Sequence, residues 1–375
     1  MTMAFVLTLA TMFLAYANGA NDNFKGVATL FGCGAVSYKS ALTLATIATF
    51  AGCIASVFVA AGLIKVFSGS GVVPPDVANT TSFMAAVAAG AAGTVMFATV
   101  TGLPISTTHS ITGAMIGAGL VAVGSAISVS ILGGSFFAPL LVSPILAVCL
   151  TAPLYFSLKW LKARFSLTEA SCICVGAAQM SPIGPDGKTL AFSSAPVTSI
   201  AIGSEVSCMV AMPGQLMIAR LSKLMDYAHY VSAAAVSFAR GMNDTPKMIA
   251  MLLVLKIYDV HLGAMTIAIA IALGGLISAK RVAYTMSKKI CEMEHAQALT
   301  ANFVTALLVI VASRFGLPVS TTHVSVSAIF GVGIVNGTAD PKVILRILAS
   351  WVLTLPVATV IGATSYAFFK TVFSG

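Results

Sequence analysis

Two short stretches of the sequence carry hydroxyl groups and a histidine in the same order. Residues 102–117 read GLPISTTHSITGAMIG, and residues 316–331 read GLPVSTTHVSVSAIFG. Nine of these sixteen positions are identical, where ordinary composition would give roughly one. In each stretch a Gly-Leu-Pro break leads into Ser-Thr-Thr, which predicts that a helix begins at the hydroxyls. Free backbone N–H groups and the positive end of the helix dipole attract anions there, so each stretch is either an anion site or a simple helix cap.

A second polar motif precedes each of these stretches and carries a carboxylate. Asp22 lies in GANDNFKG and Asp244 in RGMNDTPKM, and each is followed three residues later by a lysine, Lys25 and Lys247. A carboxylate at membrane depth costs ~2.5–3.5 kcal/mol, so each one needs a reason to be there. Three roles fit: an ion pair with the nearby lysine, a cation site built from carboxylate, Asn and backbone oxygens, or a proton relay.

The order of these motifs indicates that the chain is a duplication. An Asn-Asp pair is followed by a Ser-Thr-Thr-His stretch in both halves, at a similar separation. In duplicated membrane transporters the ligands bind between the repeats at the bilayer midplane, where helices are broken. Anion donors and cation-binding carboxylates would then lie together, as in a cation-coupled anion symporter. His109 and His323 either donate to the ligand or hold a re-entrant hairpin by bonding a carbonyl.

The composition excludes a soluble domain. Of the 375 residues, 58% are hydrophobic and 8% are charged, and the mean hydropathy is +0.99. We therefore expect an all-α polytopic membrane protein with about 10–12 membrane segments, because helices satisfy their own backbone hydrogen bonds in lipid. The net charge is +9, and the basic residues lie mainly in loops. Basic residues in the loops of a membrane protein orient the chain in the membrane. We therefore expect no nucleic-acid partner.

Three parts follow from the apolar runs: an N-terminal transmembrane repeat (1–156), a linker (157–226) and a C-terminal transmembrane repeat (227–375). The linker holds six Lys or Arg residues, which places it in the cytoplasm. The loop at 280–289 has four basic residues and its counterpart at 65–80 has one. Equivalent loops on opposite sides imply inverted topology with re-entrant hairpins, and an N-terminus outside.

At these motifs the sequence resembles the inorganic phosphate transporter (PiT) family, in members of which a Gly-Ala-Asn-Asp-type signature recurs in both halves. The resemblance covers both repeats. It implies an inverted-repeat fold, symport of inorganic phosphate with sodium or protons, and a homodimer. We expect import with sodium by alternating access, in the cell membrane. A proton-coupled phosphate or sulfate permease of the same fold is the alternative. Many members continue the first signature with Val-Ala-Asn, where this chain has Asn23-Phe24-Lys25.

The resemblance implies most of the phosphate ligands, and the oxygen-rich motifs themselves suggest Asn23 and the sodium ligands. The expected phosphate ligands are Asn21, Asp22, Asn23, Thr107, Thr108, Asn243, Asp244, Thr321 and Thr322. The expected sodium ligands are Asn21, Asp22, Ser106, Asn243, Asp244 and Ser320. No cofactor is expected besides sodium as the coupling ion. A channel needs no cation-binding carboxylates beside its anion site, and an enzyme would need a nucleophile and base supported by a carboxylate in the same motif. The sequence therefore favours a transporter over an enzyme.

Overall fold

The computed structural model describes residues 2–168, 170–178, 197–204, 206, 216–288, 293–339 and 341–373. The chain divides into two compact units, one made of Met1–Tyr155 with His229–Gly375 and the other of Phe156–Ala228. The first unit is helical and holds all four polar motifs. The second unit contains a small sheet.

The first half of the chain supplies the helices that contain or surround the first pair of motifs. They are α1 (Thr2–Asp22), η1 (Lys25–Val27), α2 (Ala28–Gly32), α3 (Tyr38–Val59), α4 (Ala61–Phe67), α5 (Pro75–Ala78), α6 (Thr81–Thr101), α7 (Thr107–Val123), η2 (Gly124–Ala126), α8 (Val129–Ile131), the π-helical η3 (Leu132–Phe137) and α9 (Ala138–Arg164). The second half supplies α11 (Leu221–Leu252), η4 (Leu253–Leu255), α12 (Val260–Ser278), α13 (Lys280–Lys288), α14 (His295–Arg314), α15 (Thr321–Asn336) and α16 (Pro341–Phe373).

Many of these helices are long enough to span a membrane. In the described part of the chain, 8 helices are long and apolar enough to cross a bilayer, and α15 is a shorter apolar helix. The helix α11 carries the charged motif around Asp244, so it is less apolar than those 8 helices. Most residues of its second half are nevertheless buried. Counting α11 and α15 with those 8 gives ten membrane segments, within the expected range.

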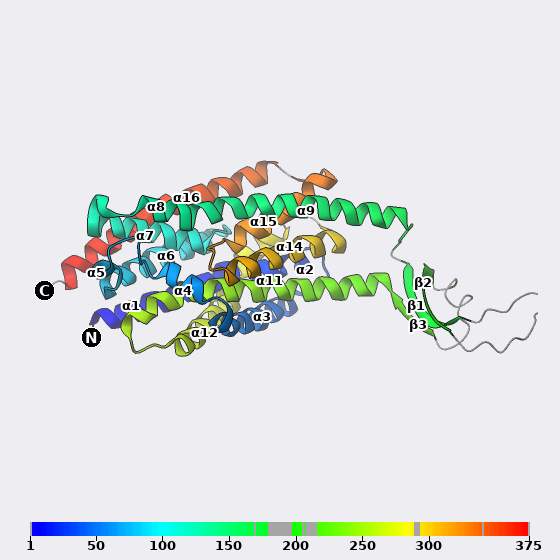
Figure 1. Cartoon of the computed structure of the whole chain (residues 1–375), viewed down its shortest axis with the longest axis horizontal. Coiled ribbons are helices and arrows are strands. Elements are labelled where there is room, and N and C mark those ends of the chain that lie inside the picture. Colours follow the sequence, from blue (N-terminus) through cyan, green and yellow to red (C-terminus); the bar gives the residue numbers. More distant parts are fainter. Residues whose placement is uncertain are drawn as a thin grey trace, which may run out of the picture. The chain divides into compact units, whose positions relative to one another are not determined.

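The two halves have opposite orientations in the first unit, which is the predicted inverted topology. The helix α1 and its counterpart α11 run in opposite directions, as do α9 and α16 (Figure 1). The halves also pack on each other through glycines, because a Cβ at Gly117 would lie 1.9 Å from the Thr359 carbonyl oxygen and one at Gly274 would lie 1.9 Å from that of Tyr16. Only glycine permits helices to cross so closely.

The Gly-Leu-Pro stretches form the breaks that the sequence predicts. Gly102 ends α6 with φ +75°, and Gly316 follows α14 with φ +68°, a left-handed conformation that glycine adopts without strain. After each break a serine caps the next helix: Ser106 accepts from the His109 N–H and Ser320 from the His323 N–H, both at 3.2 Å. We call the extended segments 102–106 and 316–320 the hairpin tips.

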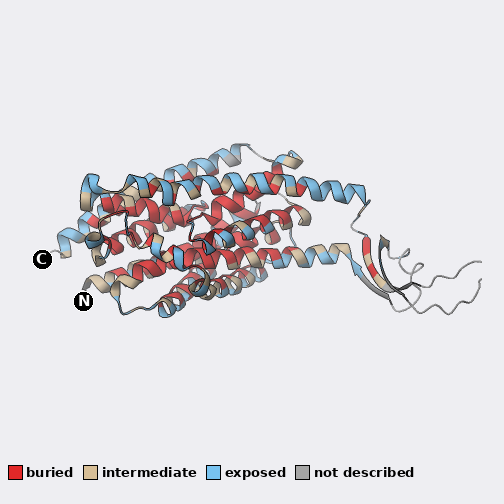
Figure 2. Ribbon diagram, in the orientation of Figure 1, coloured by how far each residue is buried: buried red, intermediate tan, exposed pale blue. Residues whose placement is uncertain are grey.

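Buried residues are concentrated inside the helical unit, and the outward faces of its helices are exposed (Figure 2). Those outward faces carry large apolar side chains such as Phe58 (72% exposed), Ile145 (63%) and Val360 (63%). Apolar area on this scale would cause aggregation in water and is suited to contact with lipid chains.

The second unit adds a sheet that the all-α expectation did not include. Strands β1 (Ser171–Ala178), β2 (Val197–Ser204) and β3 (Leu216–Arg220) form an antiparallel sheet in the order β2-β1-β3. The register pairs Ser171 with Ser204 and Cys172 with Arg220. Cys172 and Cys174 are two residues apart in β1, so they lie on the same face of the strand, and both are buried. Burial of one face favours a strand at this position.

Candidate functional site

All four sequence motifs meet inside the helical unit. Lys25, which follows the break at the end of α1, donates to a carboxylate oxygen of Asp22, to the Ile105 carbonyl oxygen (2.7 Å) and to Thr322 Oγ1 (2.6 Å). The side chains of Asp22 and Lys25 are each 2% exposed. All three ammonium protons thus have acceptors, and one of them, Thr322, belongs to α15 in the other half of the chain.

The second half repeats this arrangement. Lys247 donates to Asp244 Oδ1 (2.9 Å), to Thr108 Oγ1 (2.7 Å) and to the Val319 carbonyl oxygen (3.3 Å). Each lysine therefore pairs with the aspartate three residues earlier and contacts a threonine from the opposite repeat. Of the three roles open to the two aspartates, the ion pair with a nearby lysine is the one seen directly in this arrangement.

Asn18 joins the two ion pairs and was not identified from the sequence. Its Nδ2 lies 3.1 Å from Asp22 Oδ2, 3.1 Å from Asp244 Oδ2 and 3.0 Å from Thr107 Oγ1. Thr107 in turn donates to Asp22 Oδ2 at 3.0 Å. The signal that could have identified Asn18 is its position one helical turn before Asp22, which puts both side chains on one face of α1.

The asparagines of the two signatures hold the hairpin tips. Asn21 donates to the Leu103 carbonyl oxygen (3.0 Å) and accepts from the Ile105 N–H (3.2 Å). Asn243 donates to the Val319 carbonyl oxygen at 3.2 Å and accepts from Ser313 Oγ at 3.2 Å. By bonding the backbone of the tips, Asn21 and Asn243 position the threonines at the start of the helices that follow.

The remaining predicted ligands differ in their surroundings. Asn23 donates to Thr46 Oγ1 on α3 at 2.9 Å, and none of its described contacts reaches the two ion pairs. Thr321 is buried beside Thr322. Ser106 and Ser320 use their hydroxyl oxygens as helix caps. The structure therefore brings the aspartates, Thr107, Thr108 and Thr322 into one network, while a direct ligand role stays a prediction for all of the expected residues.

Arg240 is the most informative residue that the sequence interpretation missed, although it begins the second signature. It is 1% exposed, and none of its three guanidinium nitrogens has a hydrogen-bond partner among the described residues. It lies one turn before Asp244 on α11, and it is close enough to interact electrostatically with Asp244 and both lysines. A buried charge without hydrogen bonds is costly, so Arg240 is poised for an anionic partner.

The charges of this buried cluster do not balance. Arg240, Lys25 and Lys247 are cations, whereas Asp22 and Asp244 are the anions, which leaves a net charge of +1. The two ion pairs are complete, so the excess resides on the guanidinium. Hydroxyls of Thr107, Thr108 and Thr322 lie around the same cluster. These hydroxyls already donate to Asp22 Oδ2 and to the carbonyl oxygens of Val319 and Ile105, so the guanidinium of Arg240 is the group that a small oxyanion would pair with.

The two repeat histidines pack against each other with tilted rings. The ring centroids of His109 and His323 are 4.4 Å apart, and the His323 ring stacks on Trp351 of α16 with centroids 3.7 Å apart. His323 also makes a hydrogen bond to the backbone of Leu140. These contacts favour the hairpin-holding role for the histidines over a ligand role.

A basic cavity lies next to the first hairpin tip. Its volume is about 810 Å³. Its basic lining residues are Lys39, Lys280 and Arg281, and it extends to Thr101 and Gly102, where the tip begins. Clefts lined by positive charge concentrate anions near their walls. The cavity is therefore suited to attracting anions on this side of the bundle.

The chain is similar to known proteins over most of its length. The chain matches the phosphate transporter family over residues 18–362. It is 28% identical to a presumed phosphate permease of Haemophilus influenzae, with 99% of this chain and 98% of that protein covered. It is 26% identical to the chloroplastic inorganic phosphate transporter 2-1 of Arabidopsis thaliana, over 99% of this chain and 72% of that one.

Among solved structures, the chain resembles one described as the sodium-dependent phosphate transporter, with a TM-score of 0.77, 23% identity and full coverage of both chains. That likeness supports the helical inverted-repeat fold. The family match spans both signatures and both hairpins, so the chain is a member of the phosphate transporter family.

Proposed function

We propose that this protein is a secondary transporter that imports inorganic phosphate together with a cation. The observation that carries the proposal is the buried cluster with a net charge of +1, in which Arg240 has no hydrogen-bond partner among the described residues. A singly charged phosphate bound at Arg240 would neutralise the cluster. Its oxygens would accept from the guanidinium fork. A threonine hydroxyl of the network would donate to it only by leaving its present acceptor.

The contacts between the halves support alternating access. The Lys25 contact with Thr322 and the Lys247 contact with Thr108 each cross from one repeat to the other. Movement of one repeat against the other must break or exchange these hydrogen bonds. An anion that competes for the same lysines and threonines would couple its own binding to that movement.

Sodium is the proposed coupling ion, and the similar solved structure is described as sodium-dependent. The proposed sodium ligands remain Asn21, Asp22, Ser106, Asn243, Asp244 and Ser320. In the present arrangement Lys25 and Lys247 already contact one oxygen of each carboxylate. A sodium ion would therefore have to displace an ammonium group, or use the other carboxylate oxygen beside Asn18.

Purified protein in proteoliposomes should take up labelled phosphate faster with an inward sodium gradient than with an equal potassium gradient. Sodium that crosses together with phosphate moves down its own gradient, so an inward sodium gradient drives uptake. Uptake that follows a pH gradient and ignores sodium would replace sodium with protons as the coupling ion. An absence of phosphate uptake under either gradient contradicts the proposed function.

Phosphate and arsenate should compete for uptake, and sulfate should compete poorly. At neutral pH phosphate retains an O–H donor and sulfate has none. The Oδ2 atoms of Asp22 and Asp244 are free of lysine contacts and meet at Asn18, so they are placed to accept that proton. Discrimination at a site built around one hydrogen bond reaches ~10⁴–10⁵. Competition measured by labelled uptake tests this, and equal inhibition by sulfate would favour the sulfate-permease alternative.

We also propose that residues 1–156 and 227–375 are the two repeats and that the linker at 157–226 is cytoplasmic, with the N-terminus outside the cell membrane. The basic residues of the linker support this side. The disulfide-bonded state of Cys174 opposes it, because disulfides persist mainly in oxidising compartments. Association as a homodimer is proposed from the family resemblance.

Labelling with an impermeant maleimide tests this topology. A cysteine at Asp76, which is exposed in α5, should react from outside intact cells, whereas one at Tyr284, exposed in α13, should react only after the membrane is opened. The unsubstituted protein controls for the native cysteines. Reaction of both positions from the same side would contradict inverted topology, and reversed accessibility would place the linker outside.

A further inference from the structure

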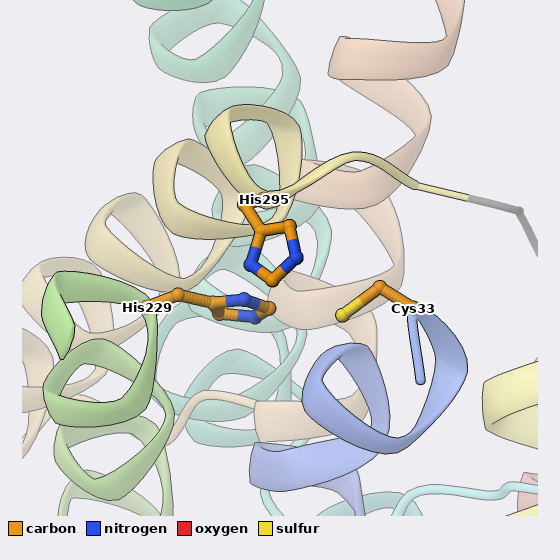
Figure 3. A group of neighbouring side chains, drawn as sticks. All are labelled: Cys33, His229 and His295. Atoms are coloured by element: carbon orange, nitrogen blue, oxygen red, sulfur yellow. The ribbon is translucent and has the colours of Figure 1, made fainter. Parts of the chain in front are cut away.

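A group of metal-binding side chains lies away from the charged cluster. Cys33 follows the end of α2, His229 lies in α11 and His295 is the first residue of α14. One potential ligand atom from each residue lies within 4.8 Å of the other two. Figure 3 shows the two imidazole rings and the sulfur atom directed toward a common centre.

Hydrogen bonds hold His229 in the orientation that a metal ligand needs. Its Nε2 lies 3.0 Å from Thr29 Oγ1. Thr29 Oγ1 also accepts from Asn302 Nδ2 (3.1 Å), and its second lone pair can accept from Nε2–H. That tautomer, which metal binding requires, leaves Nδ1 as the unprotonated nitrogen. His229 is 0% exposed, and its Nδ1 has no hydrogen-bond partner among the described residues. Metal-binding histidines in proteins are typically oriented by such a bond from the second ring nitrogen.

We propose that Cys33, His229 and His295 form a binding site for a thiophilic divalent transition metal, with Zn²⁺ as the best match. A thiolate and two imidazoles are ligands that Zn²⁺ prefers, with bonds of about 2.3 Å to sulfur and about 2.0–2.1 Å to nitrogen. Such bonds separate neighbouring ligand atoms by roughly 3.5 Å in a tetrahedron. Because the ligand atoms lie within 4.8 Å of one another, the side chains need to close by no more than about 1.3 Å. Binding converts the Cys33 thiol to a zinc thiolate and releases its proton to solvent.

The site would connect the two halves of the chain. Cys33 belongs to the first half, only eight residues after Lys25, whereas His229 and His295 belong to the second half. A bound ion would hold α2 against α11 and α14. If the repeats move during transport, which rests on the proposed function, the bound metal restrains that movement and inhibits uptake.

Metal binding is measured directly on the purified full-length protein in detergent. Added Co²⁺ should give a thiolate-to-cobalt charge-transfer band, and dialysis against excess Zn²⁺ should leave one zinc per chain by elemental analysis. Cys33→Ser should abolish the band, and His229→Gln should weaken binding by more than the ~10–100-fold that loss of a supporting hydrogen bond costs. The matched controls are Cys53→Ser, at a buried cysteine outside the cluster, and His261→Gln, at an exposed histidine.

Two outcomes would overturn the site: no thiolate band with the unsubstituted protein, or equal zinc content in the protein and in Cys33→Ser. Gel filtration identifies a variant that has failed to fold, and Cys33→Ala then replaces it. In proteoliposomes, Zn²⁺ should inhibit phosphate uptake by the unsubstituted protein and should not inhibit Cys33→Ser. Because the spectra do not depend on transport, an absence of uptake would contradict the proposed function while leaving the metal site testable.

Discussion

Replacing Arg240 by glutamine should remove most phosphate uptake and leave the protein at least as stable to heat. The guanidinium is buried and has no hydrogen-bond partner among the described residues, so in the absence of substrate its removal relieves an uncompensated charge. With substrate, the same change leaves the anion without its partner, a loss that costs about 2–5 kcal/mol for buried charge pairs. This corresponds to roughly 30- to 4,000-fold weaker binding. Equilibrium binding of labelled phosphate and melting in detergent measure the two effects.

Arg240→Lys should retain part of the binding, because lysine keeps the charge but lacks the planar fork that holds two oxygens. The control is Arg346→Gln, at an exposed arginine of α16, which should change neither binding nor melting. A strong loss of stability in Arg240→Gln would show that the arginine has an internal partner and serves the fold. Unchanged phosphate binding in that variant would contradict the assignment of the anion to Arg240.

Asp244→Asn should destabilise the protein and abolish uptake together. Lys247 and Arg240 would then face no carboxylate on α11, and removal of one member of a buried ion pair typically costs about 3–5 kcal/mol. The shape of the side chain is retained, so the effect reports on charge. The exposed helix cap Asp259→Asn is the matched control and should have little effect on either measurement.

The double variant Asp244→Asn with Lys247→Met separates structure from transport. Replacement of a whole buried ion pair by uncharged groups is often nearly neutral, so melting should return close to that of the unsubstituted protein. Uptake should remain absent, because the proposed cation ligand and the Lys247 contact with Thr108 are both lost. Normal sodium-dependent uptake in the double variant would mean that the pair is only structural and that Asp244 is not a sodium ligand.

Much of the fold could be predicted because it depends on local properties of the chain. Hydropathy and length identify the membrane helices, and the left-handed glycines at positions 102 and 316 are where a Gly-Leu-Pro break interrupts them. The repeated motifs identify the duplication, and basic residues in unequal loops predict inversion. The sheet formed by β1, β2 and β3 was not predicted, since its short strands lie in a linker with little hydropathy contrast and pair across long separations.

The sequence predicted which residues would form the candidate site, but it did not predict which of them contact one another. The sequence by itself placed Asp22, Asp244 and the threonines of both hairpins at one centre. Charged and polar groups are costly within a membrane, so a motif of such groups that recurs in an apolar chain marks a ligand site.

Only the tertiary structure decided that each lysine contacts a threonine of the opposite repeat, that Asn18 joins both carboxylates, and that Arg240 is left with a surplus charge. The cluster of Cys33, His229 and His295 could not be predicted from the sequence either, because the three residues lie far apart in the chain and share no motif. These contacts depend on where helices cross, and the crossings are set by glycines packed against backbone from the other half of the chain. Local sequence determines which groups can act, and long-range packing determines which of them meet.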